Sequence, residues 1–209
     1  MRHPIEAESY RILQERVDLT AWAAAERAVV ARVIHASADL DYAATMWFSP
    51  GAAEAGVRAL RRGAAVVADV EMVRHGITGV GASCYLGPSD RDGGEGAGGA
   101  GGEDLTRCAR AMRRAAERHP EGAVVVVGCA PTALVEAIRL SEEGRLRPAL
   151  VVGLPVGFVG AAESKSALRA SGLPAIGNLG EKGGSAVAAA VVNALVRLAS
   201  PVATKGPLP

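Results

Sequence analysis

The sequence contains very few aromatic residues, although it is rich in hydrophobic ones. Aromatic side chains account for 3% of the 209 residues, whereas hydrophobic residues account for 49%. A core of this composition must consist mainly of small aliphatic side chains on closely packed elements, which suits a layered α/β fold. The length is sufficient for one substantial core, so we expect a single domain over residues 1–200.

Cysteines are also scarce. The three in the sequence, Cys84, Cys108 and Cys129, are far apart and form no C-x-x-C pair. Their odd number and spacing argue against a disulfide framework and against a zinc site. The N-terminus lacks the apolar segment of a signal peptide, and no apolar run reaches the roughly 18 residues that a membrane span needs. We therefore expect a cytoplasmic protein that binds no structural metal and does not enter a membrane.

Neither sign of charge predominates. Lys and Arg number 23 against 22 Asp and Glu, which gives a formal net charge of +1. A chain with this balance has no overall field to attract nucleic acid or an anionic membrane. An anionic ligand must therefore be bound by a local cluster of basic groups.

Alternating strand and helix patterns are present along most of the chain. Apolar segments typical of buried strands lie at 64–68, 83–86, 123–127, 148–152 and 174–177. Helical patterns lie at 21–35, 50–63, 105–118, 131–143, 161–170 and from 185 to about 198, with a turn or short helix at 71–75 and a short amphipathic segment at 40–48. This order predicts a three-layer α/β fold with a mostly parallel sheet of about five strands. Residues 87–102 read as a flexible Gly-rich loop, and residues 201–209 as a polar tail.

Residues 153–165 form the most informative segment. It runs from a buried strand through Gly153, Gly157 and Gly160 into a helix that carries Ser164 and Lys165. Ligands of α/β sheets bind at such strand-to-helix junctions, where glycine lets the backbone approach closely. The same glycines are also consistent with a tight loop that only permits helix–sheet packing.

Three other strand-following turns carry polar groups. They are residues 69–78, 128–132 and 181–185. Helix N-termini at these turns, together with Lys165 and Lys182, favour a carboxylate or phosphate ligand. Thr132 and Ser185 could instead serve only as helix caps.

The usual signatures of a nucleophile, a P-loop or a metalloprotease are absent. A literal G-x-G-x-x-G at 96–101 has no strand before it, so we interpret it as accidental. His35 and His75 remain as candidates for proton transfer, because His3 and His119 lie in segments that read as surface. A helix C-terminus stabilises a protonated imidazole, so His35 could be a general acid or simply a helix-terminal residue.

Several motifs occur in the order typical of a known family. They are Arg-Val-Ile-His-Ala at 32–36, Phe-Ser-Pro at 48–50, residues 69–78, Ala-Pro-Thr-Ala-Leu at 130–134, residues 153–165 and Lys-Gly-Gly-Ser at 182–185. Through them the chain resembles the precorrin-8X methylmutases, also called precorrin isomerases. The resemblance implies an α/β homodimer with active sites near the subunit interface. It further implies a methyl shift from C-11 to C-12 of a cobalt-free or cobalt-containing precorrin, giving hydrogenobyrinic acid or its cobalt equivalent, without a cofactor.

The resemblance also assigns residues. It implies that His35 is the general acid, and that the substrate lies near Ser9, Arg32, Thr78, Thr132, Ser164 and Lys165. The chain departs from the usual family pattern at Gly79, Cys129 and Leu179. Alternatives are therefore a corrinoid carrier that hands the macrocycle to the next pathway enzyme, or a paralogue for a different tetrapyrrole. Independently of the resemblance, a generic nucleotide-binding domain is a further alternative.

Overall fold

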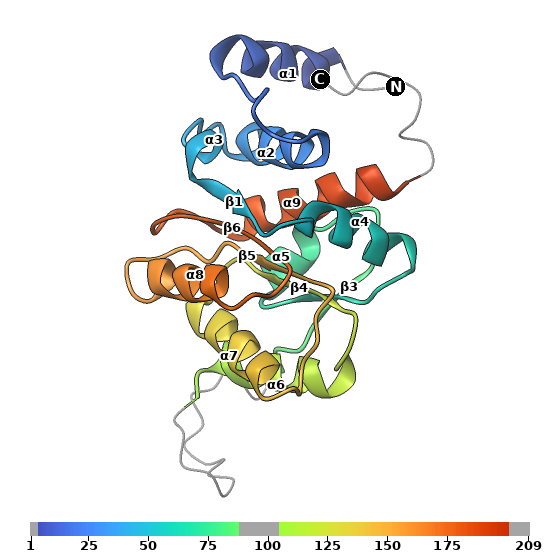
Figure 1. The fold of residues 1–209 in the computed structure, drawn as a ribbon, viewed down its shortest axis with the longest axis vertical. Helices are drawn as coiled ribbons and strands as arrows, with labels where there is room; N and C mark the ends of the chain where they lie inside the picture. Colours follow the sequence, from blue (N-terminus) through green and yellow to red (C-terminus); the bar gives the residue numbers. More distant parts are fainter. Residues whose placement is uncertain (1–3, 88–104, 201–209) are drawn as a thin grey trace, which may run out of the picture.

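The computed structural model describes residues 4–87 and 105–200, which are built around a six-stranded sheet (Figure 1). The strands lie in the order β1-β6-β5-β4-β2-β3. Five of them run parallel, and β1 pairs antiparallel with β6 at one edge. Their bounds are β1 Met46–Phe48, β2 Val66–Ala68, β3 Ala82–Cys84, β4 Val124–Val127, β5 Leu150–Gly153 and β6 Ala175–Asn178. The predicted three-layer, mostly parallel α/β fold is confirmed.

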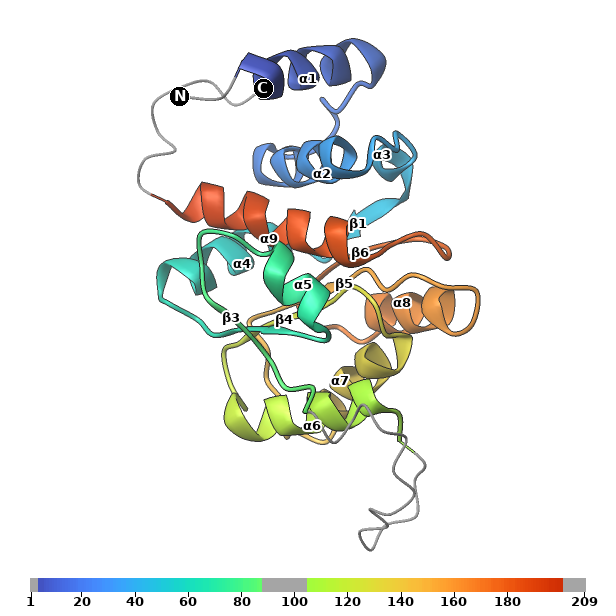
Figure 2. The same ribbon diagram turned by 180° about the vertical axis from the view of Figure 1, so that it is seen from behind.

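Helices cover both faces of this sheet, as the two opposite views show (Figures 1 and 2). One face carries α2 (Ala24–Ser37), α4 (Ala52–Arg61), α5 (Glu71–Gly76) and α9 (Ser185–Ala199). The other carries α6 (Arg107–Arg118), α7 (Pro131–Glu142) and α8 (Ala161–Ala170). The N-terminal helix α1 (Pro4–Arg16) packs on the outside of α2. No helix of the described segments is long and apolar enough to cross a membrane.

Strand β4 shows how the sequence builds two cores. Its four valines alternate between the faces: Val124 and Val126 belong to the core shared with α2, α4 and α9, whereas Val125 and Val127 belong to the core shared with α6 and α7. Burial of both faces explains why the strand reads as a continuous apolar run. Small residues then let the layers approach closely. A Cβ atom added at Gly153 would lie 2.5 Å from Leu168 Cδ2 of α8.

Two elements differ from the predictions. Helix α1 was not predicted, because it buries only Tyr10 and Leu13 and its remaining positions are mostly polar. The segment at 40–48 is not one amphipathic element but splits into α3 (Tyr42–Thr45) and strand β1. A three-residue strand is too short for a period-two pattern to show. The predicted Gly-rich loop beyond Gly87 and the predicted tail lie outside the described residues.

Candidate active site

His35 lies in the last turn of α2 and is held by α1. Its Nδ1 atom is 2.8 Å from Ser9 Oγ, within hydrogen-bond distance. Its ring stacks on Tyr10, with centroids 4.8 Å apart and planes 10° from parallel. The helix ends at Ser37, and its C-cap residue, Ala38, adopts φ 55° and donates its N–H to the Ile34 carbonyl. The imidazole is therefore oriented from two sides at the negative end of a helix dipole.

Arg32 lies one turn earlier on α2 and faces a cleft of about 390 Å³ between α1, α2 and α9. Thr78, Tyr10 and Asn193 line the same cleft. The Thr78 N–H donates to Asn193 Oδ1 at 2.7 Å, which fixes the turn after α5 against α9. Tyr10 contacts both this cleft and the His35 ring, so the structure brings Ser9, Arg32, His35 and Thr78 to one side of the sheet.

Thr132 belongs to a second group of predicted residues, on the helices of the other face. It is the second residue of α7, and its Oγ1 lies 2.6 Å from Thr106 Oγ1 at the start of α6. The N-cap of α7 is Ala130, and the N-cap of α9 is Gly184, neither with a side-chain cap bond. Thr132 and Ser185 therefore do not act as the caps that the sequence allowed.

Lys165 and Ser164 of α8 are each only 1% exposed. Lys165 Nζ donates to Lys182 O at 2.6 Å and to Asn178 Oδ1 at 3.2 Å, while Ser164 Oγ donates to Ala161 O. Burial lowers the pKa of Lys165 to about 8, and the nearby Glu181 opposes this effect. Both side chains point into the protein, where Lys165 supports the loop between β6 and α9.

Lys182 in that loop reaches across to the segment that follows α2. Its ammonium donates to Asp39 Oδ2 and to Asp41 Oδ2, each at 2.7 Å. This contact holds the pKa of Asp39 below its ordinary value. Lys165 thus holds the main chain of residue 182, and the Lys182 side chain holds the segment that follows the helix carrying His35.

Asp69 follows β2 and is only 2% exposed. Its carboxylate accepts the backbone N–H groups of Gly128, Cys129 and Ala130 at 3.2, 2.8 and 2.8 Å. Burial raises the pKa of this carboxyl, and the three donors counteract the rise. The sequence placed Asp69 at the end of a strand but gave no sign of this role, which is to fix the turn before α7.

The three departures from the family pattern lie at different places. Gly79 lines the cleft with φ +80°, Leu179 is 47% exposed, and Cys129 carries an exposed thiol beside the Asp69 turn. Partial desolvation of the thiol, together with the nearby charge of Asp69, raises the pKa of Cys129, so the thiol stays protonated at neutral pH. Among residues 4–87 and 105–200, no three His, Cys, Asp or Glu side chains are grouped so as to hold a metal ion.

Comparisons with known proteins give one consistent result. The sequence model of the precorrin-8X methylmutase family matches residues 4–198. A cobalt-precorrin-8 methylmutase of Methanothermobacter thermautotrophicus is 41% identical over 199 residues, covering 94% of this chain and 93% of the relative. A precorrin-8X methylmutase of Pseudomonas aeruginosa is 40% identical over 201 residues, covering 91% and 93%.

A solved structure supports the same assignment. The precorrin-8X methylmutase of Thermus thermophilus superposes with a TM-score of 0.82 at 36% identity, covering 94% of this chain and 98% of that one. The resemblance seen in the sequence is thereby confirmed. The chain belongs to the precorrin-8X methylmutase family and is an isomerase of cobalamin biosynthesis.

Proposed function

We propose that this isomerase moves a methyl group from C-11 to C-12 of precorrin-8X, or of its cobalt-containing counterpart, with His35 as the general acid. The product is hydrogenobyrinic acid or its cobalt equivalent. The placement of His35 carries the proposal, because the ring is clamped between Ser9 and Tyr10 at the carboxyl end of α2. Relatives named for the cobalt-free and for the cobalt-containing substrate match this chain about equally well, so the proposal includes both.

A clamped imidazole suits this reaction. A helix C-terminus favours the protonated ring, and an unperturbed imidazole titrates near pH 6.5, so it can deliver and recover a proton at neutral pH. The fixed orientation aligns the proton with one face of the bound macrocycle. Protonation of the macrocycle then eases an intramolecular migration that needs no nucleophile and no cofactor.

The residues around His35 suit a macrocycle fringed with carboxylate arms. Ser9 lines the hollow beside His35, and Arg32 and Thr78 line the neighbouring cleft between α1, α2 and α9, so a cation and hydroxyl groups lie next to apolar side chains. We propose that Thr132, Ser164 and Lys165 form a second wall of the substrate site. Thr132 is exposed at the surface of this wall, whereas Ser164 and Lys165 are buried behind it. The product would pass to the next enzyme of the corrin pathway in the cytoplasm.

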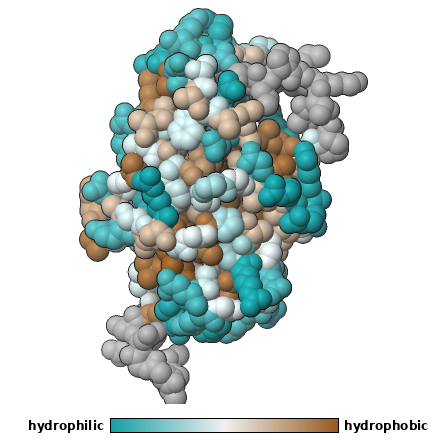
Figure 3. All heavy atoms as spheres, viewed as in Figure 1, coloured by the Kyte–Doolittle hydropathy of each residue, from teal (hydrophilic) through white to brown (hydrophobic). Residues whose placement is uncertain are grey.

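We also propose that the enzyme is a homodimer. Phe158 is 96% exposed and Val159 is 89% exposed in the loop before α8, and hydrophobic side chains protrude at this edge in the space-filling view (Figure 3). Burying such side chains between two copies would stabilise the assembly. An interface there would lie next to the wall formed by α7 and α8. Sedimentation velocity of wild type and of Phe158→Ser tests this, since the variant should shift towards monomer.

The reaction itself is tested by an absorption time course with precorrin-8X and catalytic amounts of enzyme. Methyl migration extends the conjugation of the ring and changes the visible spectrum. His35→Asn should reduce kcat by roughly a hundredfold or more while still binding the macrocycle. Full turnover by His35→Asn would refute the acid, and binding without conversion by the wild type would indicate a carrier.

A further inference from the structure

Three charged side chains from three helices meet in the cleft beside Arg32. Glu6 Oε1 of α1 lies 3.8 Å from Arg32 Nη1 of α2 and 3.3 Å from Arg197 Nη1 of α9. The side chains of Glu6, Arg32 and Arg197 are 25%, 31% and 49% exposed. One carboxylate oxygen therefore lies between two guanidinium groups that remain accessible from the cleft.

The two arginines lie on helices that pack closely against each other, whereas the glutamate lies on a peripheral helix. Helices α2 and α9 pack directly against each other, and α9 also packs against β4 and β5, while α1 is the outermost element and contacts chiefly α2 (Figure 1). Without Glu6, the positive charges of Arg32 and Arg197 would repel each other, and a bound anion would relieve this repulsion. Guanidinium pairs of this kind are well suited to bind carboxylates.

We propose that Arg32 and Arg197 form a binding subsite for one carboxylate arm of the substrate, and that Glu6 occupies this subsite in the empty enzyme. The proposal rests on the proposed function, because the arm belongs to a corrin or precorrin. Arg197, which sequence reasoning did not single out, becomes a residue that determines substrate affinity. Glu6 becomes a placeholder that the substrate arm displaces.

A carboxylate of the substrate can displace Glu6 at little cost in free energy. Ion pairs at partly exposed positions are weak, so a ligand carboxylate that gains contacts elsewhere can displace Glu6. The subsite is also close to the acid: Arg32 precedes His35 by one helical turn, and Tyr10 both lines the cleft and stacks on the His35 ring. An arm held by the two arginines would therefore anchor the macrocycle beside the imidazole.

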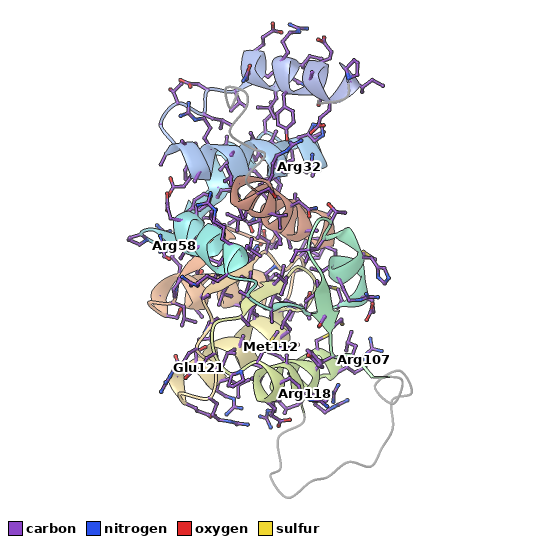
Figure 4. The ribbon with its side chains drawn as sticks, turned by 90° about the vertical axis from the view of Figure 1, so that its right-hand side faces the viewer. Arg32, Arg58, Arg107, Met112, Arg118 and Glu121 are labelled. Carbon is purple, nitrogen blue, oxygen red and sulfur yellow. The ribbon has the colours of Figure 1, made fainter. Side chains whose placement is uncertain are left out.

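The first test is a spectroscopic titration with hydrogenobyrinic acid. Arg197→Gln should weaken binding about tenfold, because it removes one charge-assisted contact at a half-exposed position. The methyl ester of the same corrin, whose arms are neutral, should bind both proteins equally. Arg118→Gln is the matched control, since Arg118 lies at the opposite end of the molecule from Arg32 (Figure 4). An Arg197→Gln variant that binds the acid like wild type would overturn the subsite.

The second test uses Glu6→Gln, which removes the competing charge and keeps the size of the side chain. We expect this variant to bind hydrogenobyrinic acid several-fold more tightly than wild type. The gain should disappear when Arg197→Gln is also present, because the two changes act on one site. Weaker or unchanged binding by Glu6→Gln, at an unchanged melting temperature, would show that Glu6 does not compete with the ligand and would refute the placeholder.

The outcomes separate this inference from the proposed function. A wild-type enzyme that neither binds the corrin nor converts precorrin-8X would refute the function itself. A wild-type enzyme that converts precorrin-8X, with KM unaffected by Arg197→Gln, would refute the subsite alone.

Discussion

The imidazole of His35 lies flat against the ring of Tyr10, with planes 10° from parallel. This contact joins the helix that carries the proposed acid to α1, which no pattern in the sequence had indicated. Tyr10 is only 5% exposed, whereas His35 is partly buried, so the tyrosine side of the stack is shielded from water. Tyr10 of α1 thus fixes the plane of the His35 ring.

Replacing Tyr10 by leucine should therefore impair catalysis more than binding. The substitution keeps apolar bulk but removes the flat surface, which should lower kcat roughly tenfold through loss of ring orientation. KM should change less, because Tyr10 is not proposed to contact the substrate arms. Steady-state kinetics with precorrin-8X would measure both. A variant with wild-type kcat would mean that the stack is only structural.

Ser9→Ala tests the second side of the clamp. It removes the 2.8 Å contact to His35 Nδ1 and leaves the stack in place. We expect a loss of about 1 kcal/mol in transition-state stabilisation, or roughly fivefold in kcat, with a shift in the basic limb of the pH–rate profile, where a general acid loses its proton. Ser9→Thr keeps the hydroxyl and should restore the wild-type profile. An unshifted profile in Ser9→Ala would contradict a role in setting the His35 proton.

The sheet and most of its helices could be predicted because each is encoded locally. The four consecutive valines of β4 and Pro131 at the first position of α7 mark a buried strand and a helix start within nine residues of sequence. Strand β1 could not be predicted, because three residues at an antiparallel edge carry too little pattern.

The site was predictable only in part, for a related reason. Arg32 and His35 share one helix, and the resemblance supplied Ser9 and Thr78. The contact between Glu6 and Arg197 joins residues 191 positions apart, and no local pattern encodes it. Asp69 shows the same limit, since its role depends on N–H groups about 60 residues away.

Lys182→Gln should loosen the end of α2. Without the ammonium, Asp39 and Asp41 lose their shared partner, so the backbone of residues 38–41 should exchange amide hydrogens faster. High salt should produce a smaller change of the same kind in wild type. Salt weakens the ion pairs of Lys182 with Asp39 and Asp41, because these side chains are partly or largely exposed. Lys182→Arg keeps the charge and serves as the control. Unchanged exchange in Lys182→Gln would show that packing alone holds this segment.

Asp69→Asn should destabilise the fold markedly. An amide offers one acceptor oxygen in place of two and turns an NH2 group towards backbone donors, leaving buried N–H groups unsatisfied. We expect a loss of about 2–4 kcal/mol in the free energy of unfolding, measured by urea denaturation. Cys129→Ala keeps the backbone donors and should change stability by less than about 0.5 kcal/mol. A stable Asp69→Asn variant would mean that the turn before α7 holds without the carboxylate.

The buried Lys165 should make the free energy of unfolding depend on pH. Its pKa is lowered to about 8 in the folded protein from an ordinary value of 10.5, mainly because burial disfavours the charge. Between these two values the unfolded chain binds more protons than the folded one, so stability contributed by this residue rises with pH across that window. Below pH 8 both states are protonated and the full burial penalty is present.

Lys165→Met removes that dependence and shows what the ammonium contributes. The variant avoids the burial of a charge but leaves Lys182 O and Asn178 Oδ1 with one donor fewer, which should cost about 1–3 kcal/mol in total at neutral pH. Urea denaturation of wild type and variant at several pH values would give two stability curves whose difference changes only between pH 8 and 10.5. A difference that stays constant over this window would mean that Lys165 titrates as an ordinary lysine, so that water reaches its ammonium in the folded protein.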